Sequence, residues 1–62
     1  MRRLSAEHRQ RILTIIHLLE HYELALRGLD AITEDLDDQG AIASAYGYVS
    51  RAAGVLRARF VR

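Results

Sequence analysis

The sequence HLLEH at residues 17–21 contains the side chains most suited to chemistry. Its pattern, H-x-x-E-H, is the inverse of a zinc-peptidase signature, and a helix would place His17 and His21 within reach of one metal ion. A catalytic zinc ion needs three protein ligands and one open position. Glu20 would have to be the third ligand, and it could then no longer act as a general base. We therefore expect ordinary surface histidines, with no metal, no cofactor and no catalytic residue, unless another chain supplies a ligand.

A second stretch, DLDDQGAIASAY, has part of the spacing of a calcium-binding loop. Asp35, Asp37 and Gly40 occupy positions 1, 3 and 6 of an EF-hand loop. Position 12 is Tyr46, where an EF-hand needs a bidentate glutamate. We interpret this stretch as a solvent-exposed acidic turn that begins a helix. The sequence also lacks a glycine-rich phosphate loop and a nucleophile motif, so it predicts a protein that is not an enzyme.

The size of the chain favours assembly with a second copy. A monomer of 62 residues buries only about 60% of its unfolded surface, and such chains usually need disulfides, a metal or oligomerisation. Cysteine is absent, which excludes disulfides and thiolate metal sites. The start, MRRLSAEHRQR, lacks the apolar core of a secretory signal, and the longest apolar stretch, ILTIIHLL, is far shorter than a membrane span of ~20 residues. We expect a cytoplasmic protein with no membrane partner.

Apolar residues recur at spacings of three and four, which predicts an all-α fold with two helices and no strand. The predicted single domain spans residues 1–62, with a first helix at about 5–36, a turn at 37–40 and a second helix at about 41–60. The first apolar series consists of Ile12, Ile15, Leu19, Tyr22, Leu26, Leu29 and Leu36. The second series consists of Ile42, Tyr46, Val49, Ala53, Leu56 and Phe60. Because a short turn makes neighbouring helices antiparallel, the expected unit is a helical hairpin.

Local signals mark the expected helix ends. Ser5 is a suitable N-cap for the first helix, and Asp37 or Asp38 for the second. Gly28 allows two interpretations: the apolar series continues through it in phase, which favours one long helix, but it could also end the helix as a C-cap, with Asp30 starting a short further helix.

The predicted helix lengths suggest why a second chain is needed. A first helix of about 48 Å would extend well beyond a second helix of about 30 Å, so residues 5–16 would lack cover from their own chain. The predicted hairpin places Arg57 beside Glu20. We expect a homodimer, most simply a four-helix bundle, because the uncovered helix is apolar nearly all round. The predicted dimer interface consists of Ile12, Ile15, Ile16 and Leu19.

Charge is divided between the ends and the middle of the chain. The eight arginines of the two chain ends, less Glu7, contribute +7, and the middle segment contributes −6, which together make the net +1. A hairpin would therefore have a basic open end and an acidic turn end. This polarity could direct self-assembly, contact nucleic acid or bind an acidic protein surface. The predicted partner-binding residues are Arg9, Arg11, Arg57 and Arg59.

The leading functional hypothesis is a small, non-enzymatic, homodimeric regulatory or adaptor protein that binds another protein. The expected shape resembles dimeric hairpins such as the plasmid copy-number regulator Rop, although shape does not carry function. The alternatives are a Rop-like RNA- or DNA-binding regulator and a purely structural assembly unit. A strip of small residues on the second helix either admits another helix or faces solvent; it consists of Ala43, Gly47, Ser50 and Gly54.

Overall fold

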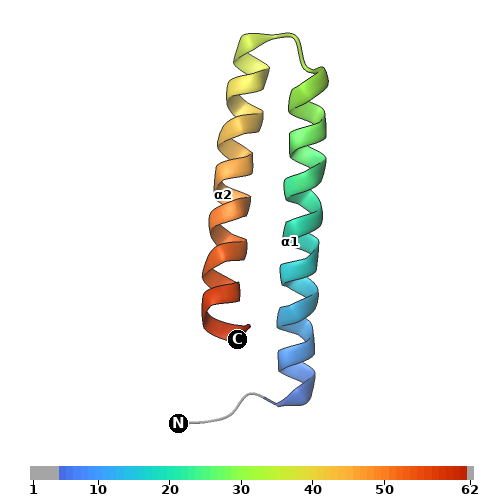
Figure 1. Ribbon diagram of the computed structural model, residues 1–62, viewed down its shortest axis with the longest axis vertical. Helices are drawn as coiled ribbons and strands as arrows, with labels where there is room; N and C mark the ends of the chain where they lie inside the picture. The colour runs from blue at the N-terminus through green and yellow to red at the C-terminus, as the bar shows by residue number, and fades with distance from the viewer. Residues whose placement is uncertain (1–4, 62) are drawn as a thin grey trace.

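Two antiparallel helices joined by a short turn make up nearly all of the described chain, residues 5–61 of this computed structural model (Figure 1). Helix α1 spans Ala6–Ile32 and helix α2 spans Leu36–Phe60. No strand occurs between residues 5 and 61. The predicted all-α helical hairpin is therefore confirmed.

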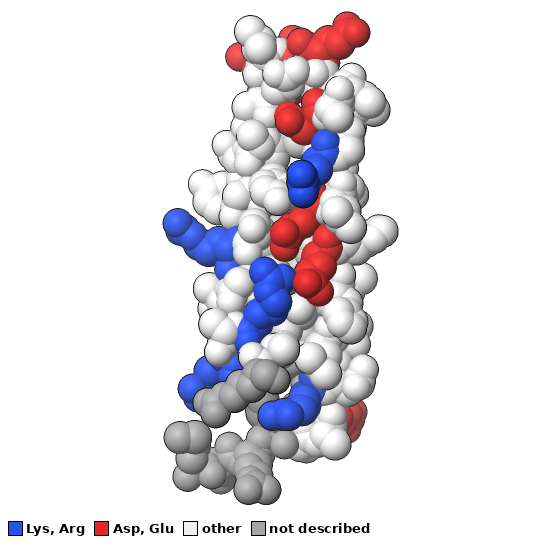
Figure 2. All heavy atoms as spheres, viewed as in Figure 1, with Lys and Arg blue, Asp and Glu red and all other residues white. Residues whose placement is uncertain are grey.

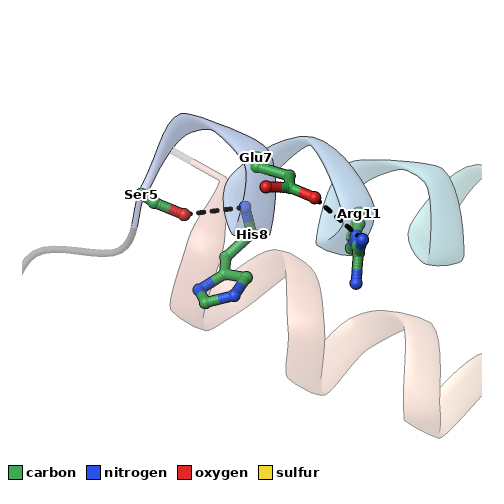
Figure 3. Close-up of polar contacts among 4 residues, drawn as sticks. All are labelled: Ser5, Glu7, His8 and Arg11. Atoms are coloured by element: carbon green, nitrogen blue, oxygen red, sulfur yellow. Dashed lines mark hydrogen bonds and ion pairs between the residues drawn. The ribbon is translucent and has the colours of Figure 1, made fainter.

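The start of α1 has the predicted cap. Ser5 has extended backbone angles, and its hydroxyl accepts a hydrogen bond of 3.1 Å from the backbone N–H of His8. Glu7, in the same first turn, forms an ion pair at 2.8 Å with Arg11, which lies one turn further along α1 (Figure 3). The cap satisfies one of the N–H groups that a helix start leaves without an intrahelical partner. The N-cap prediction for Ser5 is confirmed.

Helix α1 passes through Gly28 without a break. None of the glycines between residues 5 and 61 has a positive φ, so Gly28 does not form a left-handed C-cap. A helical glycine costs about 1 kcal/mol relative to alanine, which the flanking turns of α1 offset. The continuous helix is confirmed at this position, and the alternative break is wrong.

The turn lies at residues 33–35, so the predicted turn at 37–40 is wrong. Asp35 is the N-cap of α2, and its carboxylate accepts a 3.0 Å hydrogen bond from the backbone N–H of Asp38. Asp37 and Asp38 lie in the first helical turn, where carboxylates favour the positive end of the helix dipole. Any of the three aspartates could cap a helix, and the sequence pattern favoured the wrong ones.

Contacts at the end of α1 account for the early turn. Thr33 takes an extended conformation, and its hydroxyl donates a 2.6 Å hydrogen bond to the carbonyl of Leu29. The side-chain amide of Gln39 donates to the carbonyl of Thr33 and joins the two helix ends. Leu36, predicted to continue the first apolar series, is instead the first residue of α2 and is 80% exposed.

The inner seam is the set of residues through which the helices face each other. On α1 and its C-cap it consists of Ile12, Ile16, Leu19, Glu23, Leu26 and Thr33. On α2 it consists of Gln39, Ile42, Tyr46, Val49, Ala53, Leu56 and Phe60. All of these are buried or half-buried, and among residues 5–61 only Ile16 and Ala53 are buried fully, at 3% and 0% exposure. The apolar series predicted for the second helix is thus confirmed as the inward face of α2.

The apolar series predicted for the first helix is only partly right. Ile15, Tyr22 and Leu29 belong to it, yet all three are exposed. Helix α1 carries two apolar stripes that are offset by one residue, and the predicted series alternated between them. Only one stripe can face α2, because one residue corresponds to a rotation of about 100°.

The long overhang expected at the start of the first helix does not occur. With the turn at residues 33–35, α1 has 27 residues and α2 has 25, so α2 runs along nearly all of α1 (Figure 1). Ile16, predicted to need cover from another chain, is already buried in the hairpin. Apolar exposure is therefore distributed along the hairpin and is not concentrated at its open end.

Within residues 5–61, neither helix has the length and apolar character that a bilayer crossing would require.

Candidate functional site

The two helices together form two side faces that differ in chemistry. The residue directly before each inner-seam residue lies on one side of the hairpin, and the residue directly after it lies on the other side. This follows because successive residues of a helix are rotated by about 100°. In antiparallel right-handed helices, residues with the same offset lie on the same side of the pair. The ion pair between Glu20, which follows Leu19, and Arg57, which follows Leu56, joins the helices at 3.2 Å on one such face.

The apolar face is the side formed by residues that precede the inner seam and by Leu29, which continues the same spacing of three and four residues. Helix α1 contributes Ile15, Leu18, Tyr22, Ala25, Leu29 and Ile32. Helix α2 contributes Ala41, Ala45, Tyr48, Ala52 and Val55. Ten large apolar side chains are exposed in the part of the chain that the structure describes, and seven of them lie here, at 47–76% exposure. Exposed apolar side chains concentrated on one side of a protein are typical of interaction surfaces.

The stripes of the apolar face end in charged residues. Arg11 and Arg59 have the same offset as the stripe residues and lie at the open end of the hairpin. Asp38 has this offset at the turn end of α2, beside Asp35 and Asp37. The apolar face is therefore basic at one end and acidic at the other.

The polar face is formed by the residues that follow the inner seam. From α1 these are Leu13, His17, Glu20, Leu24 and Arg27. From α2 they are Gly40, Ala43, Gly47, Ser50, Gly54 and Arg57. In Figure 1, α1 rises on the right, with its inner seam facing α2 on the left. In a right-handed helix that rises in this way, the residue after each inner-seam residue is rotated toward the viewer, so the polar face is the front of this view. Figure 2 shows the same face, with acidic and basic groups interleaved along the junction between the helices.

A shallow groove lies on the polar face between the helices. Its walls are Leu26, Arg27, Asp30, Ile42, Ala43 and Tyr46. The strip of small residues borders this groove on α2. A Cβ atom added at Gly40, Gly47 or Gly54 would have no described atom within 4 Å, so α1 does not make a close approach to these glycines.

The predicted contact between Arg57 and Glu20 is confirmed. The two side chains are half-exposed, and such a surface ion pair contributes only about 0–1 kcal/mol. Side chains lean toward the N-terminus of their own helix. Glu20 therefore leans toward the open end of the hairpin and Arg57 leans toward the turn, which brings the two charged groups together. Nearby, Glu23 occupies an inner-seam position, and its enclosed Oε1 atom has no hydrogen-bond partner among the described residues.

The four predicted partner-binding arginines lie on both faces. Arg9, one turn before Leu13, and Arg57 lie on the polar side, whereas Arg11 and Arg59 lie at the end of the apolar face. Arg11 is paired with Glu7 and Arg57 with Glu20, while Arg9 and Arg59 form no ion pair with another described residue. The basic open end was also predicted to include Arg2, Arg3 and Arg62, which lie outside the described residues.

The four predicted dimer-interface residues are likewise divided. Ile15 lies on the apolar face, Ile16 is buried against α2, and Ile12 and Leu19 are half-buried in the inner seam. The prediction missed six further large side chains of the apolar face, although their spacing could have identified them. They are Leu18, Tyr22, Leu29, Ile32, Tyr48 and Val55. Contact of these residues with a second chain stays a prediction.

The histidines of the HLLEH sequence are both exposed. The ring of His21 packs edge-on against that of Tyr22, with centroids 6.0 Å apart. Within residues 5–61, no three histidine, aspartate or glutamate side chains gather in a group that could hold a metal ion.

Comparisons with protein-family models, with curated proteins and with solved structures give no match for this chain.

Proposed function

We propose that this chain is a small, non-enzymatic, homodimeric regulatory or adaptor protein that acts by binding another protein. The observation that carries the proposal is the apolar face, on which seven large apolar side chains remain exposed. A two-helix layer has too little interior to cover them, since only Ile16 and Ala53 are buried among residues 5–61. A second layer of helices would cover this face, and two hairpins together make a four-helix bundle.

The free energy available on this face is large for so small a protein. Full burial of one large apolar side chain is worth about 1.5–3 kcal/mol, and these side chains are roughly half exposed. Covering each one would therefore contribute about 1 kcal/mol, against a total stability of about 5–15 kcal/mol for ordinary domains. Association of two copies would accordingly supply much of the stability of the fold.

The polar face is the surface proposed for a different protein partner. It would stay exposed after the apolar faces pair, and it combines a groove, two arginines and the 67%-exposed Leu24. Arginine together with apolar and aromatic contacts is the mixture that anchors protein interfaces. The open glycine strip would allow a helix of the partner to approach closely.

The charge arrangement favours a protein partner over nucleic acid. Carboxylates lie near the arginines on the polar side of the hairpin, since Arg27 shares its grooves with Asp30 and Glu20 (Figure 2). Arg11 and Arg57 already have carboxylate partners. Phosphate groups would have to compete with these carboxylates, whereas nucleic-acid affinity depends on uncompensated basic surface. A protein can match both signs of charge.

The test combines self-association with partner capture. Sedimentation equilibrium at micromolar concentration should give a dimer, and nuclease-treated host lysate should yield a defined protein on the immobilised chain. Arg9→Glu should abolish capture, and Arg51→Glu, an equal charge change on the outer side of α2, should retain it. A folded monomer would refute the homodimer. Sub-micromolar and steeply salt-dependent binding of a defined RNA or DNA would overturn the protein-partner proposal in favour of a Rop-like regulator.

A further inference from the structure

We infer that a second copy of this chain covers the apolar face in an antiparallel orientation, with the two turns at opposite ends and α1 packed on α1 of the other copy. The inference rests on the proposed homodimer and specifies its geometry. It is carried by the size of the face, by the charges at its ends and by the spacing of its side chains.

The face is large enough for a stable dimer. The hairpin measures 48 × 16 × 15 Å, so one long side presents roughly 770 Å² in projection, close to the ~800 Å² per partner of standard protein interfaces. The exposed large apolar side chains of α1 extend from Ile15 to Ile32, about 26 Å or a little over half of that length, and the charged residues at the two ends of the face continue it. One second copy therefore suffices to cover the face.

Charge selects the orientation of the second copy. A two-fold axis along the hairpin would place both turns at one end, so the carboxylates of two acidic turns would meet and Arg11 would lie near Arg59 of the other copy. A two-fold axis across the hairpin places the turns at opposite ends. Arg11 and Arg59 of each copy then lie near the acidic turn of the other, which replaces repulsion by attraction.

The spacing of α1 fits packing against itself in reverse. Its stripe residues are separated by 3, 4, 3, 4 and 3 positions, a pattern that is the same in both directions. An antiparallel copy therefore places each stripe residue opposite another stripe residue. With the two-fold axis between Tyr22 and Ala25, the large Tyr22 ring lies opposite the small Ala25 of the second copy, and Leu18 lies opposite Leu29.

The stripe of α2 has the same property. Its positions 41, 45, 48, 52, 55 and 59 are separated by 4, 3, 4, 3 and 4, which is also the same in reverse. Packing about the middle of this stripe places Tyr48 opposite Ala52 and Val55 opposite Ala45. Tyr22 on α1 and both Tyr48 and Val55 on α2 thus lie opposite alanines, which suits close packing between the helices.

Disulfide cross-linking tests the orientation, because the chain contains no cysteine. In the variant Leu18→Cys with Leu29→Cys, the two thiols of one chain lie about 16 Å apart along α1, too far for a disulfide within the chain. We expect mild oxidation to convert this variant into a covalent dimer. The matched control, Leu13→Cys with Leu24→Cys, has the same spacing on the polar face and should stay uncross-linked.

A second measurement uses the unaltered chain. In a dimer assembled from isotope-labelled and unlabelled chains, filtered nuclear Overhauser spectra should show methyl contacts between Leu18 and Leu29 of different copies. Such contacts together with the cross-link support the inference. A dimer that lacks them, or that cross-links through Leu13 and Leu24, overturns the orientation while leaving the homodimer intact. A folded monomer overturns both.

Discussion

Replacing Leu18 by alanine should weaken self-association, whereas the same change at Leu24 should not. Leu18 lies on the apolar face at 49% exposure, and Leu24 lies on the polar face at 67%. Burying a whole leucine side chain contributes about 1.5–3 kcal/mol, so covering the exposed half of Leu18 contributes about 1 kcal/mol. A dimer contains two such side chains, so Leu18→Ala should cost about 2 kcal/mol and raise the dimer Kd about 30-fold.

Sedimentation equilibrium over a range of concentrations measures this change directly. Both variants replace an exposed leucine in the middle of α1 by the best helix former, so helix propensity changes equally in the two. Circular dichroism checks that the helix content is retained. Leu24→Ala should leave the dimer Kd within about twofold, a difference of less than 0.5 kcal/mol.

Two results would refute the reasoning. If Leu18→Ala left the Kd unchanged, the apolar face would not be the self-association surface. If Leu24→Ala weakened the dimer as much as Leu18→Ala, association would involve the polar face, and the proposed binding surface for another protein would already be occupied.

Four further predictions address the fold and the histidines. Asp35→Ala should lower the free energy of unfolding by about 1 kcal/mol through loss of the α2 cap, and an unchanged denaturant midpoint would contradict this turn. Gly47→Ala should raise stability by about 0.5–1 kcal/mol, since its Cβ meets open space, and a loss of dimer stability would indicate a helix packed on the strip. Glu23→Leu should raise the melting temperature, because it removes an enclosed carboxylate oxygen without a partner, and a fall would show that this oxygen is satisfied by solvent. Replacing His17 and His21 together by alanine should change neither folding nor metal content; near-stoichiometric zinc in chelator-free protein, lost in this variant, would contradict the prediction.

The elements that depend on local chemistry were predictable from the sequence. Ser5 precedes a helical pattern and has a side chain that can accept from the helix start, so its cap followed from residue type and position. The helix through Gly28 followed from the apolar pattern continuing in phase. The inward face of α2 followed as well, because that helix carries a single unbroken apolar series from Ile42 to Phe60.

The position of the turn depended on interactions between the helices. Asp35, Asp37 and Asp38 have equal local ability to cap a helix, so residue type could not choose among them. In the folded chain, Gln39 of the second helix donates a hydrogen bond to the carbonyl of Thr33, and this contact joins the two helix ends across the turn at residues 33–35. The predicted helix lengths, and with them the expected overhang, were wrong for this reason.

The sequence by itself determined that this chain forms two amphipathic helices with a basic end and an acidic end. Only the tertiary structure decided which apolar stripe of α1 became the inner seam. The two stripes are offset by one residue and both carry large apolar side chains, so the sequence of α1 alone does not show which of them faces α2. Packing against α2 placed Ile16 inside and left Ile15 and Leu18 on the surface. The same choice of rotation assigned Arg11 and Arg27 of α1 to opposite faces, since a helix turns as a rigid unit and one buried stripe sets the direction of every other side chain on that helix.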